Sequence, residues 1–266
     1  MLKFFRSIRQ DLLSEGKTTK YLKYAIGEII LVVVGIVIAL QLDGWNANRL
    51  DGREEQMLLT QLKTEFIQNK TQLLTKIGKR EDALNSCFEI LKIVDNPQLE
   101  KDPNQIDSLF ATILPNYTFD PTTGIINQLL HGGKLSLIRN DSLRFHLSNW
   151  EGIVDQATEE EKIYMLFNMN DLRPTLYELY PFRNIMVKSG SSGSLREILL
   201  KEGNENRFEL GKSKLPMDLD KLFSSTEFEG KISSTINWLS VSNIQAQGFI
   251  DYSDTVLKLI DEALEE

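Results

Sequence analysis

The chain has very few of the residues that disulfides and metal sites require. Its 266 residues include one cysteine, Cys87, and two histidines, His131 and His146. One cysteine excludes an internal disulfide, and the histidines do not have the spacing of a zinc site. We therefore expect Cys87 to pack in an apolar interior, with an intermolecular disulfide as the alternative, and both histidines to act as helix caps or packing residues. We expect no metal.

Motifs for catalysis and nucleotide binding are also missing. The sequence His131-Gly-Gly has no accompanying G-x-S-x-G elbow, and no Gly-Lys pair belongs to a phosphate-binding loop. The net charge of −8 argues against nucleic acid, since phosphate contacts need clustered lysine and arginine. The run Glu159-Glu-Glu161 is typical of a solvated helix face. We expect no cofactor, no identifiable small-molecule ligand and no enzymatic activity.

One long apolar run, residues 25–42, is present instead. Its 18 residues, AIGEIILVVVGIVIALQL, would span roughly 27 Å as a helix, which is close to the thickness of a bilayer's hydrocarbon core. Trp45 follows at the depth where tryptophan is favoured in membranes. The sequence therefore predicts a transmembrane helix over 25–42.

Charge predicts the orientation of this helix. Residues 1–24 carry a net charge of +4, whereas residues 46–266 carry −10. Positive flanks stay in the cytoplasm, so we expect residues 1–24 there and a domain of residues 46–266 in the periplasm. A cleaved signal peptide is the alternative, but Leu40-Gln-Leu42 offers no small-x-small cleavage site.

The first residues form a basic amphipathic pattern. In residues 2–13, apolar side chains recur on one helical face, and Lys3, Arg6 and Arg9 lie towards the other. This pattern favours a helix on an anionic membrane surface. A tail that is bound to a partner or disordered is the alternative.

A stripe of four residues marks one face of the predicted span. Steps of four, three and four join Glu28, Val32, Gly35 and Ala39. Gly35 and Ala39 form a small-xxx-small pair, which permits close helix approach, and ionisable groups inside membranes usually face protein or water. We expect this stripe to contact a second membrane helix, in a homo-oligomer or a larger partner. A monomeric anchor, with Glu28 reaching the headgroups, is the alternative.

Long helices are predicted beyond the span. The first covers 46–94, with continuity into the span as an open alternative. Its apolar face recurs at steps of three, four or seven: Leu59, Leu62, Phe66, Leu73, Ile77, Leu84, Phe88 and Leu91. Asn69 falls in this face, where it would either fix the register of a coiled coil or be solvated. The last long helix is predicted over 226–265.

Capping signals place shorter helices between them. Asp102-Pro103 and Asp120-Pro121 each predict a helix start, the second helix ending at Gly132-Gly133. Asn140 predicts a helix that runs to about Tyr180 with a bend at Pro174. Residues 181–193 are expected to be a loop, and Ser194–Glu197 is a capping box.

Several local sequences near the N-terminus form a recognisable set: Leu2-Lys-Phe-Phe-Arg6, Leu12-Leu-Ser-Glu-Gly-Lys17, Tyr21–Glu28, Gly35–Leu40 and Trp45-Asn46, with a central segment, Gly132–Arg144. Through them the N-terminal 50 residues resemble an uncharacterised, single-span, membrane-anchored protein family common in flavobacteria and their relatives. The resemblance implies an inner-membrane anchor and a helical periplasmic region, and no activity comes with it.

The sequence as a whole predicts an all-α protein with a single N-terminal transmembrane helix followed by an extramembrane bundle of long helices. We expect a non-enzymatic assembly or adaptor subunit of a cell-envelope complex in the bacterial inner membrane. Its partners would be the lipid bilayer and another protein or a second copy. The alternative is a periplasmic sensor that signals through a membrane partner.

Overall fold

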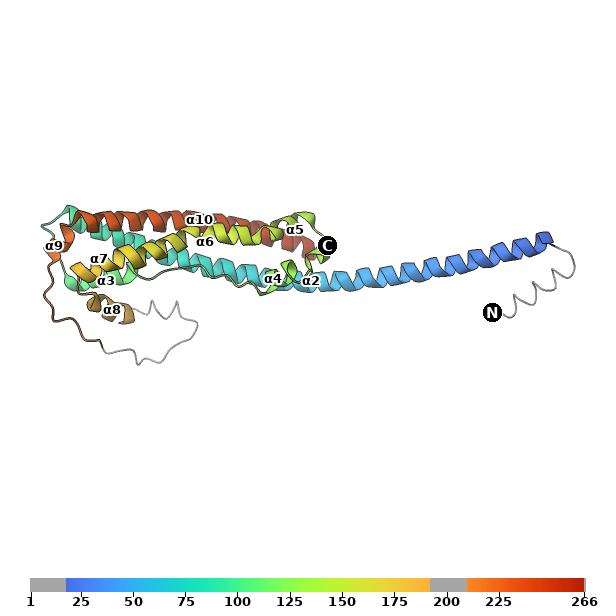
Figure 1. The fold of residues 1–266 in the computed structure, drawn as a ribbon, viewed down its shortest axis with the longest axis horizontal. Helices are drawn as coiled ribbons and strands as arrows, with labels where there is room; N and C mark the ends of the chain where they lie inside the picture. Colours follow the sequence, from blue (N-terminus) through green and yellow to red (C-terminus); the bar gives the residue numbers. More distant parts are fainter. Residues whose placement is uncertain (1–17, 192–209, 266) are drawn as a thin grey trace. The chain divides into compact units, whose positions relative to one another are not determined.

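A computed structural model describes residues 18–191 and 210–265. All regular structure in these residues is helical, which confirms the all-α prediction for the described part of the chain (Figure 1). The helices are α2 (Thr18–Asp95), α3 (Pro103–Ile113), α4 (Gly124–Leu130), the 3₁₀ turn η1 (Leu135–Leu137), α5 (Asp141–Ser148), α6 (Trp150–Phe167), the π-helical η2 (Asn168–Leu172), α7 (Arg173–Leu179), α8 (Phe182–Ser191), α9 (Leu219–Phe223) and α10 (Thr226–Glu265).

The contacts divide the chain after Met57 into two units. In the first unit, α2 is the one helix of the described residues that is long and apolar enough to cross a membrane, and none of its most apolar stretch is buried. Trp45 is 64% exposed, and the Arg49 guanidinium lies 5.9 Å from the centre of its ring. The described part of the chain therefore contains a single candidate span, as the sequence predicts.

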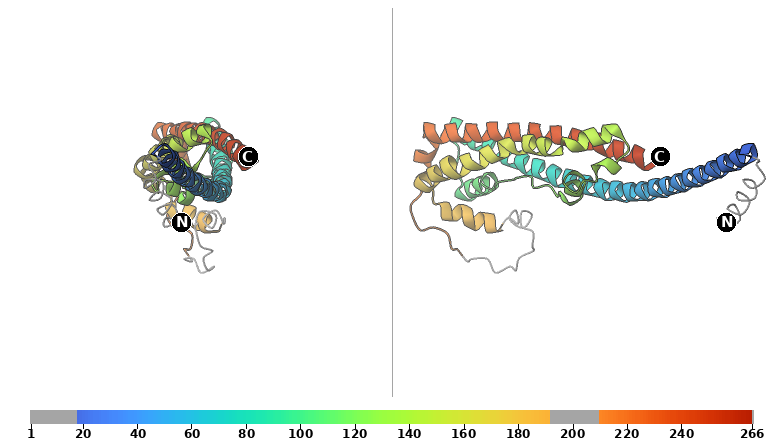
Figure 2. Two further views of the ribbon diagram at one scale, coloured as in Figure 1. Left: turned by 90° about the vertical axis from the view of Figure 1, so that its right-hand side faces the viewer. Right: turned by 45° about the vertical axis from the view of Figure 1, so that its right-hand side comes forward.

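In the second unit, α10 runs antiparallel to residues 58–95 of α2. Lys63 pairs with Asp261 at 2.6 Å, and Lys70 pairs with Asp254. From the first pair to the second, the lysine lies seven residues later on α2 and the aspartate lies seven residues earlier on α10. The two helices are therefore antiparallel. Figure 2 shows α6 beside both helices.

Two large apolar cores and a smaller cluster of Ala83, Tyr117, Tyr164 and Leu239 fill the second unit. In the first, the ring of Trp150 on α6 lies 4.9 Å from Phe66 on α2 and 5.4 Å from Phe249 on α10. In the second, the ring of Phe110 on α3 packs edge-on against two rings, Phe228 of α10 and Tyr180. Aromatic side chains contribute large buried areas, so these two centres hold the long helices together.

The inner face of α2 follows a heptad-like pattern. Buried residues on this face recur at steps of three and four, with one step of seven from Leu73 to Arg80: Leu59, Leu62, Phe66, Asn69, Leu73, Arg80, Ala83, Cys87 and Ile90. The burial of Leu59, Leu62, Phe66 and Leu73 is as predicted. The prediction that Phe88 belongs to this face is wrong: Phe88 is 50% exposed, because it follows Cys87 by one residue and so points about 100° away.

Helix α3 begins as predicted, whereas α4 does not. The Asp102 carboxylate accepts a hydrogen bond from the Asn104 N–H, with Pro103 in the first helical position. Asp120-Pro121 does not open a helix, and α4 begins at Gly124. Three side chains of α2 bind the backbone of this segment and keep it out of a helical conformation.

Asn69, Gln72 and Glu65 bind the chain before α4. Asn69 both donates to the Thr122 carbonyl and accepts from its N–H, each at 2.8 Å. Gln72 makes the same pair of bonds with Asp120. The Glu65 carboxylate accepts the N–H groups of Ile125 and Ile126, at 2.8 and 3.1 Å, which places a negative charge at the N-terminus of α4, where the helix dipole favours it.

The stop at Gly132-Gly133 is confirmed. A Cβ atom at Gly132 would lie 2.3 Å from the Gln128 carbonyl oxygen, and Gly133 has a φ of 71°. Both positions exclude larger residues without a shift of the backbone. The chain therefore leaves α4 through two glycines. The following residues, Leu135–Leu137, form η1.

The helix predicted from Asn140 to Tyr180 is divided. Asn140 caps α5 by accepting from the Leu143 N–H, but the chain breaks at Asn149, whose ψ of 1° is not helical. The π-helical η2 lies just before Pro174, where the missing N–H and the ring disrupt α-helical bonding. The helical series ends at Tyr180 as predicted.

The loop predicted over 181–193 is wrong for its first part, because α8 covers Phe182–Ser191. Ile185 is fully buried in the second core, and α8 packs against α3. Tertiary packing thus outweighs the serine and glycine content. Lys3, Arg6 and Arg9 and the capping box Ser194–Glu197 lie outside the described residues.

Candidate functional site

A buried ion pair occupies the middle of the second unit, and we call it, with the Phe119 backbone, the polar centre. Arg80 of α2 donates through Nη1 to Glu161 Oε1 of α6 at 2.6 Å. The other oxygen, Oε2, accepts from the Phe119 N–H at 2.7 Å. Arg80 is 2% exposed and Glu161 4%. Glu161 is therefore not part of a solvated face, contrary to the prediction for residues 159–161.

Burial sets the ionisation of this pair. It raises the pKa of the Glu161 carboxyl above its ordinary value, and the Arg80 charge and the Phe119 N–H oppose that rise in part. The same burial lowers the pKa of the Arg80 guanidinium, against the attraction of Glu161. Each group therefore depends on its partner for a charge that the interior disfavours.

Further polar contacts fix the backbone around the polar centre. The Tyr164 hydroxyl donates to the Ile113 carbonyl at 3.0 Å, and Asn168 Nδ2 donates to the Leu114 carbonyl at 2.9 Å. Arg173 Nη2 donates to the same Leu114 oxygen. Helices α6, η2 and α7 thus hold the chain that leaves α3, in the same way that α2 holds the chain before α4.

Local sequence patterns do not reveal the polar centre. Glu161 stands in a run of three glutamates, and its partner is 81 residues away. The available signal is the position of Arg80, seven residues after Leu73 in the heptad of α2. A charge at a buried heptad position needs a partner of opposite sign, so the position of Arg80 predicts a buried carboxylate elsewhere in the chain.

The predicted membrane stripe lies on one face of α2. Val32, Gly35 and Ala39 are exposed and Glu28 is partly exposed. A Cβ atom added at Gly35 meets nothing within 4 Å, so the surface there is open. Contact of this stripe with another helix stays a prediction.

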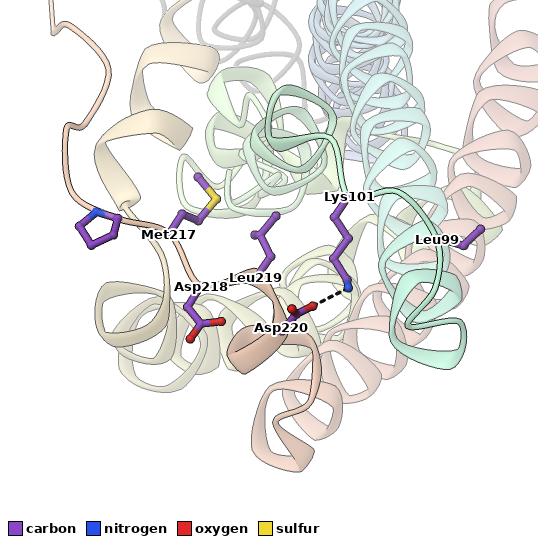
Figure 3. Close-up of a pocket in the computed structure, with 7 residues that line it drawn as sticks. Leu99, Lys101, Met217, Asp218, Leu219 and Asp220 are labelled. Carbon is purple, nitrogen blue, oxygen red and sulfur yellow. Dashed lines mark hydrogen bonds and ion pairs between the residues drawn. The ribbon is translucent and has the colours of Figure 1, made fainter.

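A surface groove lies at the start of α9 (Figure 3). It measures about 710 Å³ between Leu99, Lys101 and residues 216–220. Its charged groups already have partners: Lys101 Nζ lies 2.7 Å from Asp220 Oδ1, and Asp218 caps α9 by accepting from the Lys221 N–H. The charged side chains that line the groove are thus already engaged within the protein.

The remaining candidate residues have structural roles. Cys87 is a buried free thiol, as predicted. His131 is the C-cap of α4 and lies 3.4 Å from Glu151, and the His146 ring contacts Tyr252. No group of three histidine, cysteine, aspartate or glutamate side chains in residues 18–191 and 210–265 is placed to hold a metal ion.

Comparison with known proteins shows a family similarity over part of the chain. No curated protein and no solved structure matches the chain. Residues 28–154 match DUF6090, a family of unknown function. The matched range runs from Glu28 in the candidate span to α6, and includes Asn69 and Arg80. This similarity fits the expected kinship with an uncharacterised family.

Proposed function

We propose that the protein is a membrane-anchored assembly or adaptor subunit of a cell-envelope complex, without enzymatic activity. It would lie in the inner membrane of a Gram-negative bacterium, with its N-terminus in the cytoplasm and residues 46–266 in the periplasm. The observation that carries the proposal is the exposure of the apolar part of α2. Ile29, Leu31 and Leu40 are each more than 60% exposed, and apolar surface of this extent needs lipid or another protein.

The second unit supports a scaffold role as an extramembrane helical bundle. Residues 58–95 of α2, together with α6 and α10, enclose their own apolar cores. The polar centre joins α2 to α6, and the Lys63–Asp261 pair joins α2 to α10. A self-contained bundle presents a fixed surface, which suits assembly.

The stripe Glu28–Val32–Gly35–Ala39 would supply the contact within the membrane. Small residues let helix backbones approach, and polar groups bond across the interface. The partner would be a second copy or a larger membrane protein.

Cysteine crosslinking in native membranes tests this proposal. In a Cys87→Ala background, Ala39→Cys should crosslink to a neighbouring helix, and Gly35→Leu should reduce the yield several-fold by blocking close approach. Val37→Cys is the matched control, because Val37 points about 180° from the centre of the stripe and should crosslink little. Equal yields at positions 37 and 39, or no crosslink at either, would contradict the proposed interface.

A sensor is the second candidate, favoured by the continuity of α2. This helix has no break from Thr18 to Asp95, so the candidate span and the inner face of the second unit belong to one element. Deleting the gene distinguishes the two proposals. Loss of an assembled envelope complex at unchanged transcript levels supports the adaptor, whereas a changed transcript profile with the complex intact supports the sensor.

A further inference from the structure

One edge of the Arg80 guanidinium has no partner among the described residues. Nη1 bonds to Glu161, but Nε and Nη2 are buried and make no hydrogen bond to any described residue. These two atoms form the side edge of the guanidinium, where two N–H groups point the same way. A buried donor without an acceptor is costly, so this fork requires an oxygen or an anion that residues 18–191 and 210–265 do not supply.

A second orphaned group faces the same space. Ser242 of α10 is buried, and its Oγ also has no hydrogen-bond partner in the described residues. Arg80, Glu161 and Ser242 line one cavity, together with Tyr164, Leu239 and residues 116–118. Unsatisfied groups from α2 and α10 therefore meet in a single enclosed site.

The size of the cavity selects its occupant. Its volume is about 10 Å³, which corresponds to roughly one water molecule measured with a water-sized probe. Phosphate, carboxylates and other polyatomic anions are too large. The charge of Arg80 is already balanced by Glu161 at 2.6 Å, so the site needs an acceptor and not a second negative charge.

We propose that one ordered water molecule occupies this cavity. It accepts from the Nε–H and Nη2–H fork of Arg80 and donates to Ser242 Oγ. The water extends the Arg80–Glu161 pair to α10, so that α2, α6 and α10 share one polar layer between the two apolar cores. Buried waters characteristically satisfy such groups with two to four hydrogen bonds.

Nuclear magnetic resonance of the full chain in nanodiscs tests the proposal. Arginine labelled with ¹⁵N gives a side-chain Hε signal for Arg80, which Arg80→Lys identifies by its loss. We expect slow exchange of this Hε and a cross-peak to a long-lived water. Absence of that cross-peak in the parent protein would overturn the proposal. A shift of the Arg80 signal when bromide replaces chloride would also overturn it, because the occupant would then be an anion.

Two serine variants localise the water. Ser242→Val fills the cavity with methyl groups and should abolish the cross-peak. Ser253→Val is the matched control, since Ser253 is also a buried serine of α10 with an unpaired Oγ, but it does not line this cavity. Its cross-peak should be retained. Loss of the cross-peak in both variants, or in neither, would contradict this placement; if Ser242→Val does not fold, the measurement on the parent decides.

Discussion

Asn69 of α2 pairs with the backbone of Thr122 as a neighbouring strand would, donating to its carbonyl and accepting from its N–H at 2.8 Å each. Asn69 is almost fully buried. It is therefore neither a solvated residue nor part of a coiled-coil interface with a second chain. Within the second unit, it fixes where the chain before α4 attaches to α2.

Asn69→Leu should destabilise the second unit. The change removes both hydrogen bonds between Asn69 and the Thr122 backbone, and each such bond contributes about 0.5–1.5 kcal/mol. Denaturant unfolding measures the loss, and hydrogen exchange at Thr122 should accelerate. Lys70→Ala is the control, because Lys70 makes only an ion pair near the surface with Asp254, and such pairs contribute about 0–1 kcal/mol. Equal losses for both variants would refute this role of Asn69.

Two phenylalanines of α2 should respond differently to truncation. Phe66 is fully buried against Trp150, whereas Phe88 is half exposed. We expect Phe66→Ala to cost about 3–5 kcal/mol through the cavity it leaves, and Phe88→Ala to stay within about 1 kcal/mol. Thermal melts of the two variants provide the comparison. A larger effect at Phe88 would mean that this face is covered by another chain.

Leu73→Ala should resemble Phe66→Ala, because Leu73 occupies the same buried heptad face. A buried leucine truncated to alanine typically costs about 2–5 kcal/mol. The melting temperature should therefore fall by several degrees. The fall should not depend on protein concentration if the face is satisfied within one chain; a strong concentration dependence would contradict this and indicate an intermolecular coiled coil.

Arg80→Met should be among the most damaging single changes. It leaves the Glu161 carboxylate buried without its cation, and breaking a buried pair typically costs about 3–5 kcal/mol. Because burial already raises the pKa of Glu161, its folded pKa lies above its unfolded value. The contribution of Glu161 to stability is therefore complete below its unfolded pKa and is lost as pH rises through its folded pKa. We expect a steeper loss of stability with pH in the variant, because Arg80 no longer opposes the rise of this pKa.

The double variant Arg80→Met/Glu161→Leu provides the control for the ion pair. It removes both charges, so it should recover much of the lost stability and should lack most of the pH dependence that Glu161 causes. Unfolding of both variants at a series of pH values gives the comparison. A double variant as unstable as Arg80→Met would show that packing, and not the unpaired charge, causes the loss.

Cys87 should be unreactive in the folded protein. Burial raises the pKa of its thiol from 9.0 to about 12, and the thiolate is the reactive form. Alkylation at pH 8 should require unfolding. Because the folded pKa is the higher one, the contribution of Cys87 to stability is complete below pH 9 and is lost between pH 9 and 12. Cys87→Ala should remove that part of the alkaline loss; rapid labelling of the native protein would contradict the buried site.

The sequence-based predictions succeeded where local signals dominate. Helix α10 has the predicted bounds because its apolar period is long, and Asp102 caps α3 because Pro103 favours the first helical position. They failed where distant residues decide the local structure. Asn69 and Glu65 override the Asp120-Pro121 signal, and core packing of Ile185 makes α8 helical. Nothing in the three glutamates at 159–161 identifies Glu161 as the partner of Arg80.

A topology measurement tests the central claim of a membrane anchor most directly. Residues 1–24 carry a net charge of +4, and the remainder beyond the candidate span carries −10, so the positive end should stay in the cytoplasm. We predict that a reporter active only outside the cytoplasm works when fused after Glu266, and that the fusion stays in the membrane fraction after an alkaline wash. A reporter active only in the cytoplasm that works at the same site, or release of the protein by the wash, would contradict the account.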